Sequence, residues 1–326
     1  MSPARLRAAA VRVPGSTSNL GAGFDCLGLA FQRHLHVRFS PEVSGTLVTE
    51  YGGTLAALGQ RRAGDDAGHA GFTAAPRNLL TAAFKERMRS LGVLRVTGRL
   101  TAESDIPIAC GLGSSAAATV AGILLADAVL GRAPDPVETL AIATEREGHP
   151  DNAAPALLGG LVAVARGEDG SPAAFRLPLS PDIAFVFAAP AVEIATPAAR
   201  AALPATVPHP LAARGLGRMA ALLHGLATGD PALLRLGLLD ELHVPHRLPL
   251  IPRARETFRA AAAAGAWGTT ISGSGSGLIA LCPADRAAAV RDAMARELGA
   301  SGLDTTAFVA AADEQGARVL EPEPVP

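Results

Sequence analysis

Hydrophobic and polar positions follow two periods along this chain, and the two periods alternate from one end to the other. A period of two or a short apolar run is typical of a strand, whereas apolar residues three or four apart are typical of a helix. The predicted strands are 5–14, 34–39, 94–100, 161–165, 183–189 and 278–282. The predicted helices are 78–91, 116–130, 136–147, 197–202, 211–228, 231–239, 252–264 and 284–298. Strands and helices interleave throughout, which predicts an α/β or α+β fold.

Some stretches lack either period. Residues 52–71 are rich in glycine and weakly patterned, and we expect a mobile excursion there; the tail 321–326 should be loose. Two glycine-rich loops, 15–25 and 272–277, each lie next to a predicted strand. These loops, and the longer stretch described next, are where we expect the chemistry of the protein.

One stretch between a predicted strand and a predicted helix organises the rest of the chain. It consists of Pro107, Ile108, Ala109, Cys110, Gly111, Leu112, Gly113, Ser114, Ser115, Ala116 and Ala117. Its glycines allow a tight turn and a close approach of the backbone to a ligand. The helix that follows, with Ser114 or Ser115 as its N-cap, offers free N–H groups and the positive end of its dipole. Such a place binds anions, phosphate above all, although a strand-to-helix turn without a ligand has the same pattern.

The stretch matches neither of two common nucleotide motifs. No Gly-Lys-Ser or Gly-Lys-Thr follows its glycines, which excludes a Walker A loop. The third glycine of a dinucleotide fingerprint is also missing.

Composition and charge narrow the class of protein. The 326 residues are enough for two domains, and 49% hydrophobic against 18% charged residues indicates a globular chain. The net charge of -1 gives no electrostatic reason to expect a nucleic acid or an anionic membrane as partner. No apolar run reaches the length of a membrane span, and we expect no signal peptide.

Cysteine and histidine spacing argues against disulfides and zinc. Three cysteines at uneven spacing, Cys26, Cys110 and Cys282, fit free thiols in a reducing compartment, so we predict a cytoplasmic protein. The histidines at 34, 36, 243 and 246 do not have zinc-ligand spacing.

Three motifs in order, 14–25, 107–117 and 271–277, resemble those of the GHMP kinase superfamily. The middle one is similar to that superfamily's phosphate loop and the last to its third conserved motif. Finer matches resemble the homoserine kinases within it. They are Ser18–Asp25, Glu147–Pro155 with Gly159 and Gly160, Ala195–Pro204 and Gly316–Leu320. The resemblance runs from about residue 11 to about residue 320. It departs at Ser276, where many relatives have proline, and over 45–75.

The resemblance implies a two-domain α+β fold. Residues 1–165 would form an N-terminal domain like the second domain of ribosomal protein S5, with a left-handed βαβ unit. Residues 166–326 would form a ferredoxin-like C-terminal domain. We place the boundary before the polar stretch 166–172.

The resemblance also implies a reaction, the transfer of the γ-phosphoryl of ATP to the side-chain hydroxyl of L-homoserine in threonine biosynthesis. Such a transfer needs positioning and charge stabilisation more than covalent help. Residues 107–117 would hold the phosphates, and Ser115 would ligate Mg2+. A hard cation also needs a carboxylate, which would come from Glu147 or Glu145.

The acceptor would be a zwitterion, and the resemblance supplies a residue for each of its groups. Asn19 and Asp25 would hold the ammonium, and Arg200 and Arg247 would hold the carboxylate, which suits a guanidinium fork. Asn152 would meet the hydroxyl, with His149 and Gly273 lining the same pocket. The catalytic set would be Asn152, Ser115, Glu147 and Arg200. Asp151 is a tempting general base, but the homoserine kinases offer an asparagine for this place, so we do not assign Asp151 that role.

Two alternatives stay open from the sequence. One is another GHMP kinase, acting on mevalonate or a related compound, whose acceptor has no ammonium for Asn19 and Asp25 to hold. The other is a non-catalytic protein of this fold that binds a ligand or a partner. The resemblance also allows a homodimer.

Overall fold

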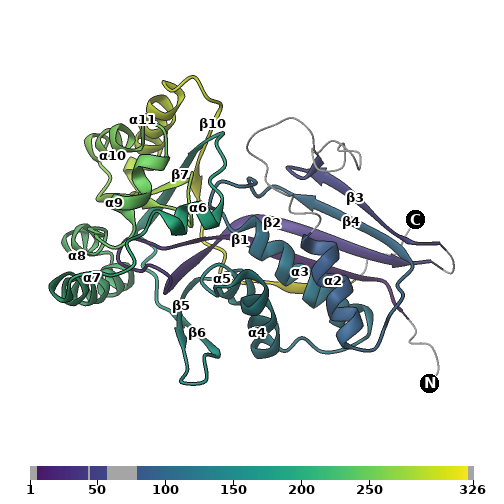
Figure 1. Ribbon diagram of the computed structural model, residues 1–326. Helices are drawn as coiled ribbons and strands as arrows, with labels where there is room; N and C mark the ends of the chain where they lie inside the picture. The colour runs from purple at the N-terminus through teal and green to yellow at the C-terminus, as the bar shows by residue number, and fades with distance from the viewer. Residues whose placement is uncertain (1–5, 43–44, 57–78, 322–326) are drawn as a thin grey trace.

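The computed structural model of the protein describes residues 6–42, 45–56 and 79–321, which form two sheets with helices around them (Figure 1). The strands are β1 (Ala9–Ser18), β2 (Leu27–Pro41), β3 (Leu47–Gly53), β4 (Gly98–Ser104), β5 (Leu161–Arg166), β6 (Pro172–Leu177), β7 (Ile183–Pro190), β8 (Gly268–Ile271), β9 (Leu278–Pro283), β10 (Thr305–Ala310) and β11 (Arg318–Leu320).

The helices are α2 (Leu79–Ser90), α3 (Ser114–Val129), α4 (Pro136–Glu147), α5 (Ala153–Leu158), α6 (Thr196–Ala201), α7 (His209–Thr228), α8 (Pro231–Gly237), α9 (Val244–Arg247), α10 (Ala254–Ala263) and α11 (Ala287–Gly299). Two 3-10 turns, η1 (Leu248–Leu250) and η2 (Ala284–Arg286), precede α10 and α11. Residues 57–71 of the predicted excursion and 322–326 of the predicted tail lie outside the described residues.

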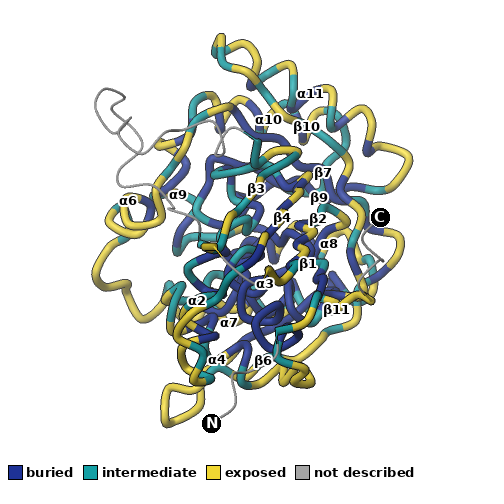
Figure 2. The backbone as a smooth tube through the Cα atoms, turned by 90° about the vertical axis from the view of Figure 1, so that its right-hand side faces the viewer, coloured by how far each residue is buried: buried dark blue, intermediate teal, exposed yellow. Residues whose placement is uncertain are grey.

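The larger sheet belongs to the first domain and has the order β11-β1-β2-β4-β3, with β5 and β6 attached to β2. The long strand β2 pairs with β5 near its start and with β4 near its end. Strands β3 and β4 are parallel, and α2 lies between them in sequence, so they form a βαβ unit. Helix α3 packs on β1 and β2 beside α2, and most of its residues are buried, as the dark blue stretch in Figure 2 shows.

The smaller sheet confirms the ferredoxin-like prediction. Its order is β10-β7-β9-β8, and all of its pairs are antiparallel. The first and third strands of this domain therefore lie in the middle of the sheet, and helices connect the first strand to the second and the third to the fourth. Helices α10 and α11 pack against each other, and α11 contacts β7 and β10.

Several predictions of local structure were wrong at an element's end or in its cap; for example, the strand predicted at 34–39 is part of β2, which begins at Leu27. The first strand does not stop at Pro14 but continues to Ser18, since Pro14 lies at a shift of register where a ladder tolerates proline. The strand predicted at 94–100 begins only at Gly98, because the pairing with β2 ends at Pro41. Helix α3 is not capped by Ser114 or Ser115; its N-cap is Gly113. The helix predicted at 284–298 is an α-helix only from Ala287.

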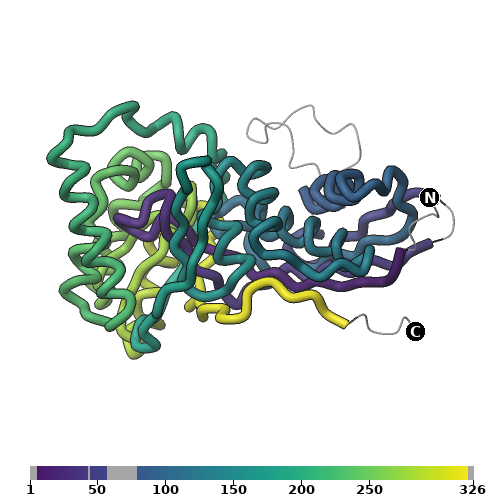
Figure 3. Tube along the Cα trace, turned by 90° about the horizontal axis from the view of Figure 1, so that it is seen from below, coloured from purple at the N-terminus to yellow at the C-terminus, as the bar shows by residue number. Residues whose placement is uncertain are grey.

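The polar stretch 166–172 is the turn of a hairpin rather than a linker. Strand β6 follows it and pairs with β5 over residues 161–166. At the far end of the chain, β11 returns to the first sheet and pairs with β1, which Figure 3 shows as a yellow segment beside the purple strand. We therefore propose a division between Leu177 and Ile183, after the hairpin, instead of after residue 165.

Candidate active site

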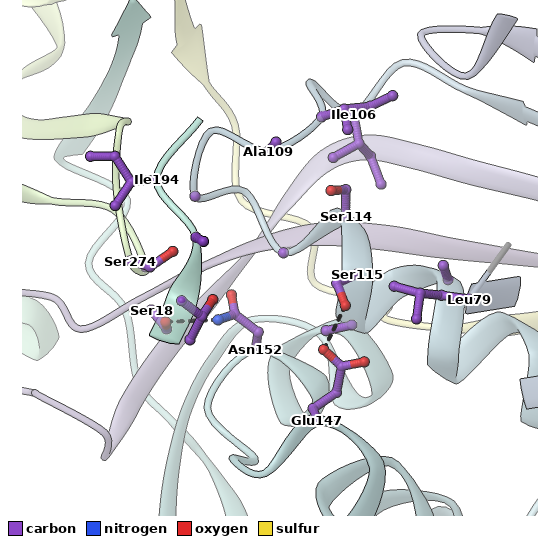
Figure 4. A pocket seen from close by; sticks show the side chains of 18 of the residues that line it. Ser18, Leu79, Ile106, Ala109, Ser114, Ser115, Glu147, Asn152, Ile194 and Ser274 are labelled. Atoms are coloured by element: carbon purple, nitrogen blue, oxygen red, sulfur yellow. Dashed lines mark hydrogen bonds between the residues drawn. The ribbon is translucent and has the colours of Figure 1, made fainter. Parts of the chain in front are cut away.

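A cavity of about 510 Å³ lies where the three glycine-rich motifs meet (Figure 4). One part of its wall is apolar and includes Leu35, Tyr51, Leu55, Leu79, Leu80 and Ile106. The other part is polar and includes Ser18, Asn19, Glu147, His149, Asp151, Asn152, Arg200, Arg247 and Gly273. The loop 108–116 lies between the two parts. Of the described residues predicted for the site, the wall leaves out Asp25 and Glu145, and within the phosphate loop it leaves out Pro107, Cys110, Leu112 and Ala117.

The predicted phosphate loop has the geometry of an anion site. Gly111 and Gly113 have φ values of 83° and 62°, which a residue with a Cβ rarely adopts. A Cβ at Gly113 would lie 2.4 Å from Ser16 Oγ, so the glycine is required by its neighbours as well as by its own backbone. Because no side chain caps α3, the first N–H groups of the helix, from Ser114 to Ala116, have no acceptor among the described residues. They are free to bind an anion at the positive end of the helix.

The three motifs are bonded to one another directly. The backbone N–H of Ser16 donates to the carbonyl of Leu112 at 3.1 Å. Ser272 Oγ donates to the carbonyl of Gly111 at 2.6 Å and lies 2.7 Å from Thr17 Oγ1. The order of motifs in the sequence therefore becomes a single constellation in space.

Cys110, within the loop, is not a nucleophile. Burial raises the pKa of its thiol to about 12, so the thiol carries no charge near neutral pH.

Glu147 is the acidic residue that meets the phosphate loop. It is the last residue of α4, and its carboxylate accepts hydrogen bonds from Ser115 Oγ at 2.7 Å and from Thr119 Oγ1 at 2.6 Å. Figure 4 shows the first of these bonds beside the loop. Glu145, the other predicted carboxylate, is exposed and lies outside the cavity wall. The structure therefore favours Glu147 over Glu145 for a cation next to Ser115.

Asn152 lies at the bottom of the polar part, at the start of α5. Its Nδ2 donates to Ser18 Oγ at 2.8 Å, and its Oδ1 accepts from Ser16 Oγ at 3.1 Å. Both serines come from β1. We had expected their positions to lie in the loop 15–25 and had assigned neither serine a role. Their strand alternation, with residues 16 and 18 on one face, is the signal that could have identified them.

His149 and Asp151 form a pair beside Asn152. His149 Nδ1 lies 2.6 Å from Asp151 Oδ1, and the hydrogen bond between them raises the pKa of His149 against the effect of burial. Burial by itself raises the pKa of Asp151, but its hydrogen bonds with His149 and Ser18 and the charge of Arg200 outweigh burial, so its pKa is lowered. Both shifts favour the charged forms of the pair, the imidazolium of His149 and the carboxylate of Asp151.

The stability contributed by this pair should depend on pH with a defined sign. Because the pKa of His149 is raised, the contribution is complete below the unfolded histidine value of about 6.5 and is lost as pH rises through the raised value. It is lost again as pH falls through the lowered pKa of Asp151. We expect the loss of unfolding free energy in His149→Gln, measured by urea denaturation, to be largest near about pH 5 to 6. A loss that grows steadily above pH 7 would contradict this assignment.

Asp25 and Arg200 were expected at opposite ends of an amino acid, but they contact each other. Arg200 Nη1 and Nη2 each lie 3.0 Å from an oxygen of Asp25, as a two-pronged ion pair. The hydrogen bond from Asp25 raises the pKa of Arg200. Both side chains are half-exposed, and the planar fork of the arginine matches the two oxygens of the carboxylate. Arg200 lies on the cavity wall, whereas Asp25 does not.

Arg247 is different, because it is buried without a carboxylate partner. Its side chain is 2% exposed, donates to the carbonyls of Ala199 at 3.1 Å and Gly273 at 3.4 Å, and packs 5.0 Å from the ring of Phe24. No described acidic residue forms an ion pair with it. Burial, with the positive charge of Arg200, lowers its pKa. A buried charge of this kind is costly unless something pairs with it.

Asn19 and Gly273 join this group of side chains. Asn19 Nδ2 donates to the carbonyl of Gly273 at 2.9 Å, and its Oδ1 accepts from the backbone N–H of Asp25 at 2.8 Å. Asn19 therefore fixes the loop that carries Asp25 and also holds loop 272–277 in place. Ser276, where many relatives have proline, donates from its hydroxyl to the carbonyl of Val192 and so anchors the same loop.

The described part of the chain contains neither a cluster of metal-ligating side chains nor a membrane-spanning helix. No group of three or more histidine, cysteine, aspartate or glutamate side chains there could hold a metal. Among the helices of the same residues, none is long and apolar enough to cross a membrane.

Known proteins match the chain over nearly its whole length. The models of the GHMP kinases N terminal domain and the GHMP kinases C terminal domain match residues 78–160 and 219–300. A homoserine kinase of Moorella thermoacetica is 40% identical over 95% of this chain and 99% of its own, and one of Gloeobacter violaceus is 41% identical over 87% and 91%.

Solved structures agree with these matches. A crystal structure of homoserine kinase from Cytophaga hutchinsonii has a TM-score of 0.79 at 29% identity and covers 96% of this chain and 97% of that one. A mevalonate kinase from L. major has a TM-score of 0.68 at 14% identity, which is a likeness of fold alone. With matches to both domains and to nearly full-length relatives at about 40% identity, the chain belongs to the GHMP kinase family.

Proposed function

We propose that this protein transfers the γ-phosphoryl of ATP to the side-chain hydroxyl of L-homoserine, forming O-phospho-L-homoserine for threonine biosynthesis. The observation that carries the choice of acceptor is Arg247, a buried guanidinium on the cavity wall with no described acidic partner. The named relatives at 35–41% identity support the same substrate.

The two parts of the cavity suit the two substrates. The apolar part around Tyr51 and Leu80 fits a purine ring, and the loop 108–116 beside it offers the free N–H groups for the phosphates. The polar part, which includes Asn152 and Arg247, is left for the acceptor. ATP and the acceptor thus approach each other across the N-terminus of α3.

The donor set beside the loop fits Mg2+. This cation takes few protein ligands and completes its shell with phosphate oxygens and water, so one carboxylate and one hydroxyl are enough. Glu147 and Ser115 would hold it, and it would neutralise negative charge on the phosphates.

The acceptor end carries charges of both signs, as a zwitterion requires. We propose that Arg247, with Arg200 next to it, receives the carboxylate, and that Asp25 and Asn19 face the ammonium. For this the pair of Asp25 and Arg200 has to open, because Asp25 occupies both Nη atoms of Arg200. Mevalonate, which has a carboxylate but no ammonium, would leave Asp25 without a role.

Asn152 is the residue that we propose for the acceptor hydroxyl. It lies on the wall between the phosphate loop and the acceptor end, and its side chain is fixed by Ser16 and Ser18. We assign no general base. The lowered pKa of Asp151 keeps it ionised, but its carboxylate is 2% exposed and already bonded to His149.

A coupled assay of ADP release with three acceptors tests the proposal. We expect turnover with L-homoserine and at most about a hundredth of that kcat/KM with mevalonate or galactose, since each lacks at least one charge that the site is built to pair. Product identity should be checked by phosphorus NMR. Preferred turnover of mevalonate would establish the first alternative, another GHMP kinase. If none of the three acceptors led to ADP release, the second alternative, a non-catalytic binding protein, would be favoured.

We also propose that the enzyme acts in the cytoplasm. All three cysteines are unpaired, which fits a reducing compartment. A homodimer stays a prediction from the resemblance.

A further inference from the structure

We infer that Thr119 is a positioning residue that holds the carboxylate of Glu147 at the cation site. The inference rests on the part of the proposed function that makes Glu147 a ligand of Mg2+. Thr119 belongs to the helix after the phosphate loop, one turn beyond Ser115. It lies outside the sequence motif and is not on the cavity wall.

The contacts of Glu147 point to this role. Thr119 Oγ1 donates to Oε1 of Glu147 at 2.6 Å, while Ser115 Oγ donates to Oε2 at 2.7 Å. Residues four apart on a helix lie on the same face, so α3 presents two hydroxyls to the two oxygens of one carboxylate. Both oxygens are therefore fixed, and the carboxylate cannot rotate without breaking a short hydrogen bond.

The two hydroxyls differ in what they can do when a cation arrives. Ser115 lines the cavity, and its oxygen can turn toward a cation or a phosphate. Thr119 is fully buried, and Glu147 is its one side-chain partner among the described residues. Water cannot replace that bond. Thr119 therefore keeps Glu147 in place at the moment when the hydroxyl of Ser115 is needed elsewhere.

The position of Glu147 makes such a support necessary. Glu147 ends α4, and the next residue, Gly148, has a positive φ of 83° and turns the chain away toward Asn152. Helix ends fray, so the last turn of α4 by itself constrains Glu147 less than the interior of the helix would. The hydroxyl of Thr119 on α3 fixes the carboxylate of Glu147 and so links the end of α4 to the helix that follows the phosphate loop.

The test compares Thr119→Val with Thr119→Ser. Valine keeps the shape and removes the hydroxyl, whereas serine keeps the hydroxyl and removes the methyl group. The measurement is the affinity for Mn2+ in the presence of ADP, followed by electron paramagnetic resonance, which needs no acceptor and no turnover. We expect Thr119→Val to weaken Mn2+ binding about 10-fold or more, the usual effect of losing a partner of a metal ligand, and Thr119→Ser to stay within about threefold of wild type.

Two further variants separate positioning from a loss of stability. Thr119→Ala also removes the hydroxyl and serves if the valine variant does not fold. In a Glu147→Gln background, Thr119→Val should weaken Mn2+ binding no further, because a positioning residue acts only through the group that it holds. Melting temperatures of all variants show whether a change in affinity merely follows a change in stability.

Several results would overturn the inference. These are wild-type Mn2+ affinity in both Thr119→Val and Thr119→Ala, an equal loss in Thr119→Ser, or an additive loss in the Glu147→Gln background. If wild-type protein binds no Mn2+ in the presence of ADP, Glu147 is not a cation ligand, and the inference about Thr119 is then wrong as well. Failure of homoserine as acceptor is a separate result, seen in the ADP-release assay, and leaves the Mn2+ data unchanged.

Discussion

Glu147→Gln should lower kcat by about 10²- to 10³-fold and leave the melting temperature nearly unchanged. Glutamine has the shape of glutamate and can still accept a hydrogen bond from Ser115 or Thr119, so the half-buried end of α4 keeps its packing. It loses the negative charge that a hard cation requires. The loss should therefore appear in kcat and in Mn2+ affinity, measured by steady-state kinetics and by titration, rather than in folding.

The chain offers a matched control two residues earlier. Glu145 lies on the same helix and was the alternative carboxylate in the sequence, but it is exposed and outside the cavity wall. Glu145→Gln should keep kcat within about twofold of wild type, as expected of a surface substitution away from any special feature. A large loss in Glu145→Gln with little loss in Glu147→Gln would show that the cation site was assigned to the wrong carboxylate.

The fold could be predicted where local signals decide it. Asp135 caps α4 through bonds to two backbone N–H groups, Pro136 follows at the first position, and Gly148 ends the helix. All three signals are legible in sequence. The pairing of β11 with β1 was not predictable in this way, because its partners, Ala10 and Leu320, are far apart in the chain.

The motifs predicted which residues form the site, but they did not predict how its charged side chains pair. The resemblance of the motifs implied roles for Asn19, Asn152 and Gly273, and the structure brings all three to the wall of one cavity. Asp25 and Arg200 lie 175 residues apart in the chain, so their ion pair depends on tertiary contacts that no local sequence pattern shows. The resemblance gives Arg200 and Arg247 the same role, on a firmer motif match for Arg200. The structure distinguishes them by burial: Arg200 is half-exposed and paired with Asp25, and Arg247 is buried with no described acidic residue in an ion pair with it.

That difference makes Arg247→Met the most informative substitution at the acceptor end. Arg247 is 2% exposed, and no described acidic residue forms an ion pair with it, although Asp25, Asp151 and Asp240 attract its charge from farther away. Methionine fills a similar space without that cost, so the free energy of unfolding should be no lower than that of wild type. Homoserine binding should suffer, because losing a charge-assisted hydrogen bond costs about 1.5–3 kcal/mol, or roughly 10- to 150-fold in KM. The KM for ATP should stay nearly unchanged.

In Arg247→Met the free energy of unfolding should therefore be kept while the affinity for homoserine falls, a combination that few other substitutions would show. Homoserine should raise the melting temperature of wild type and fail to raise that of Arg247→Met at the same concentration. Arg259→Met, which removes an exposed charge from α10, serves as the control and should behave as wild type. An amino alcohol that lacks the carboxylate should bind wild type weakly and lose little more on substitution. A sharp fall in melting temperature, or a rise in KM for ATP instead of homoserine, would mean that Arg247 supports the fold or the nucleotide and that the acceptor's carboxylate binds elsewhere.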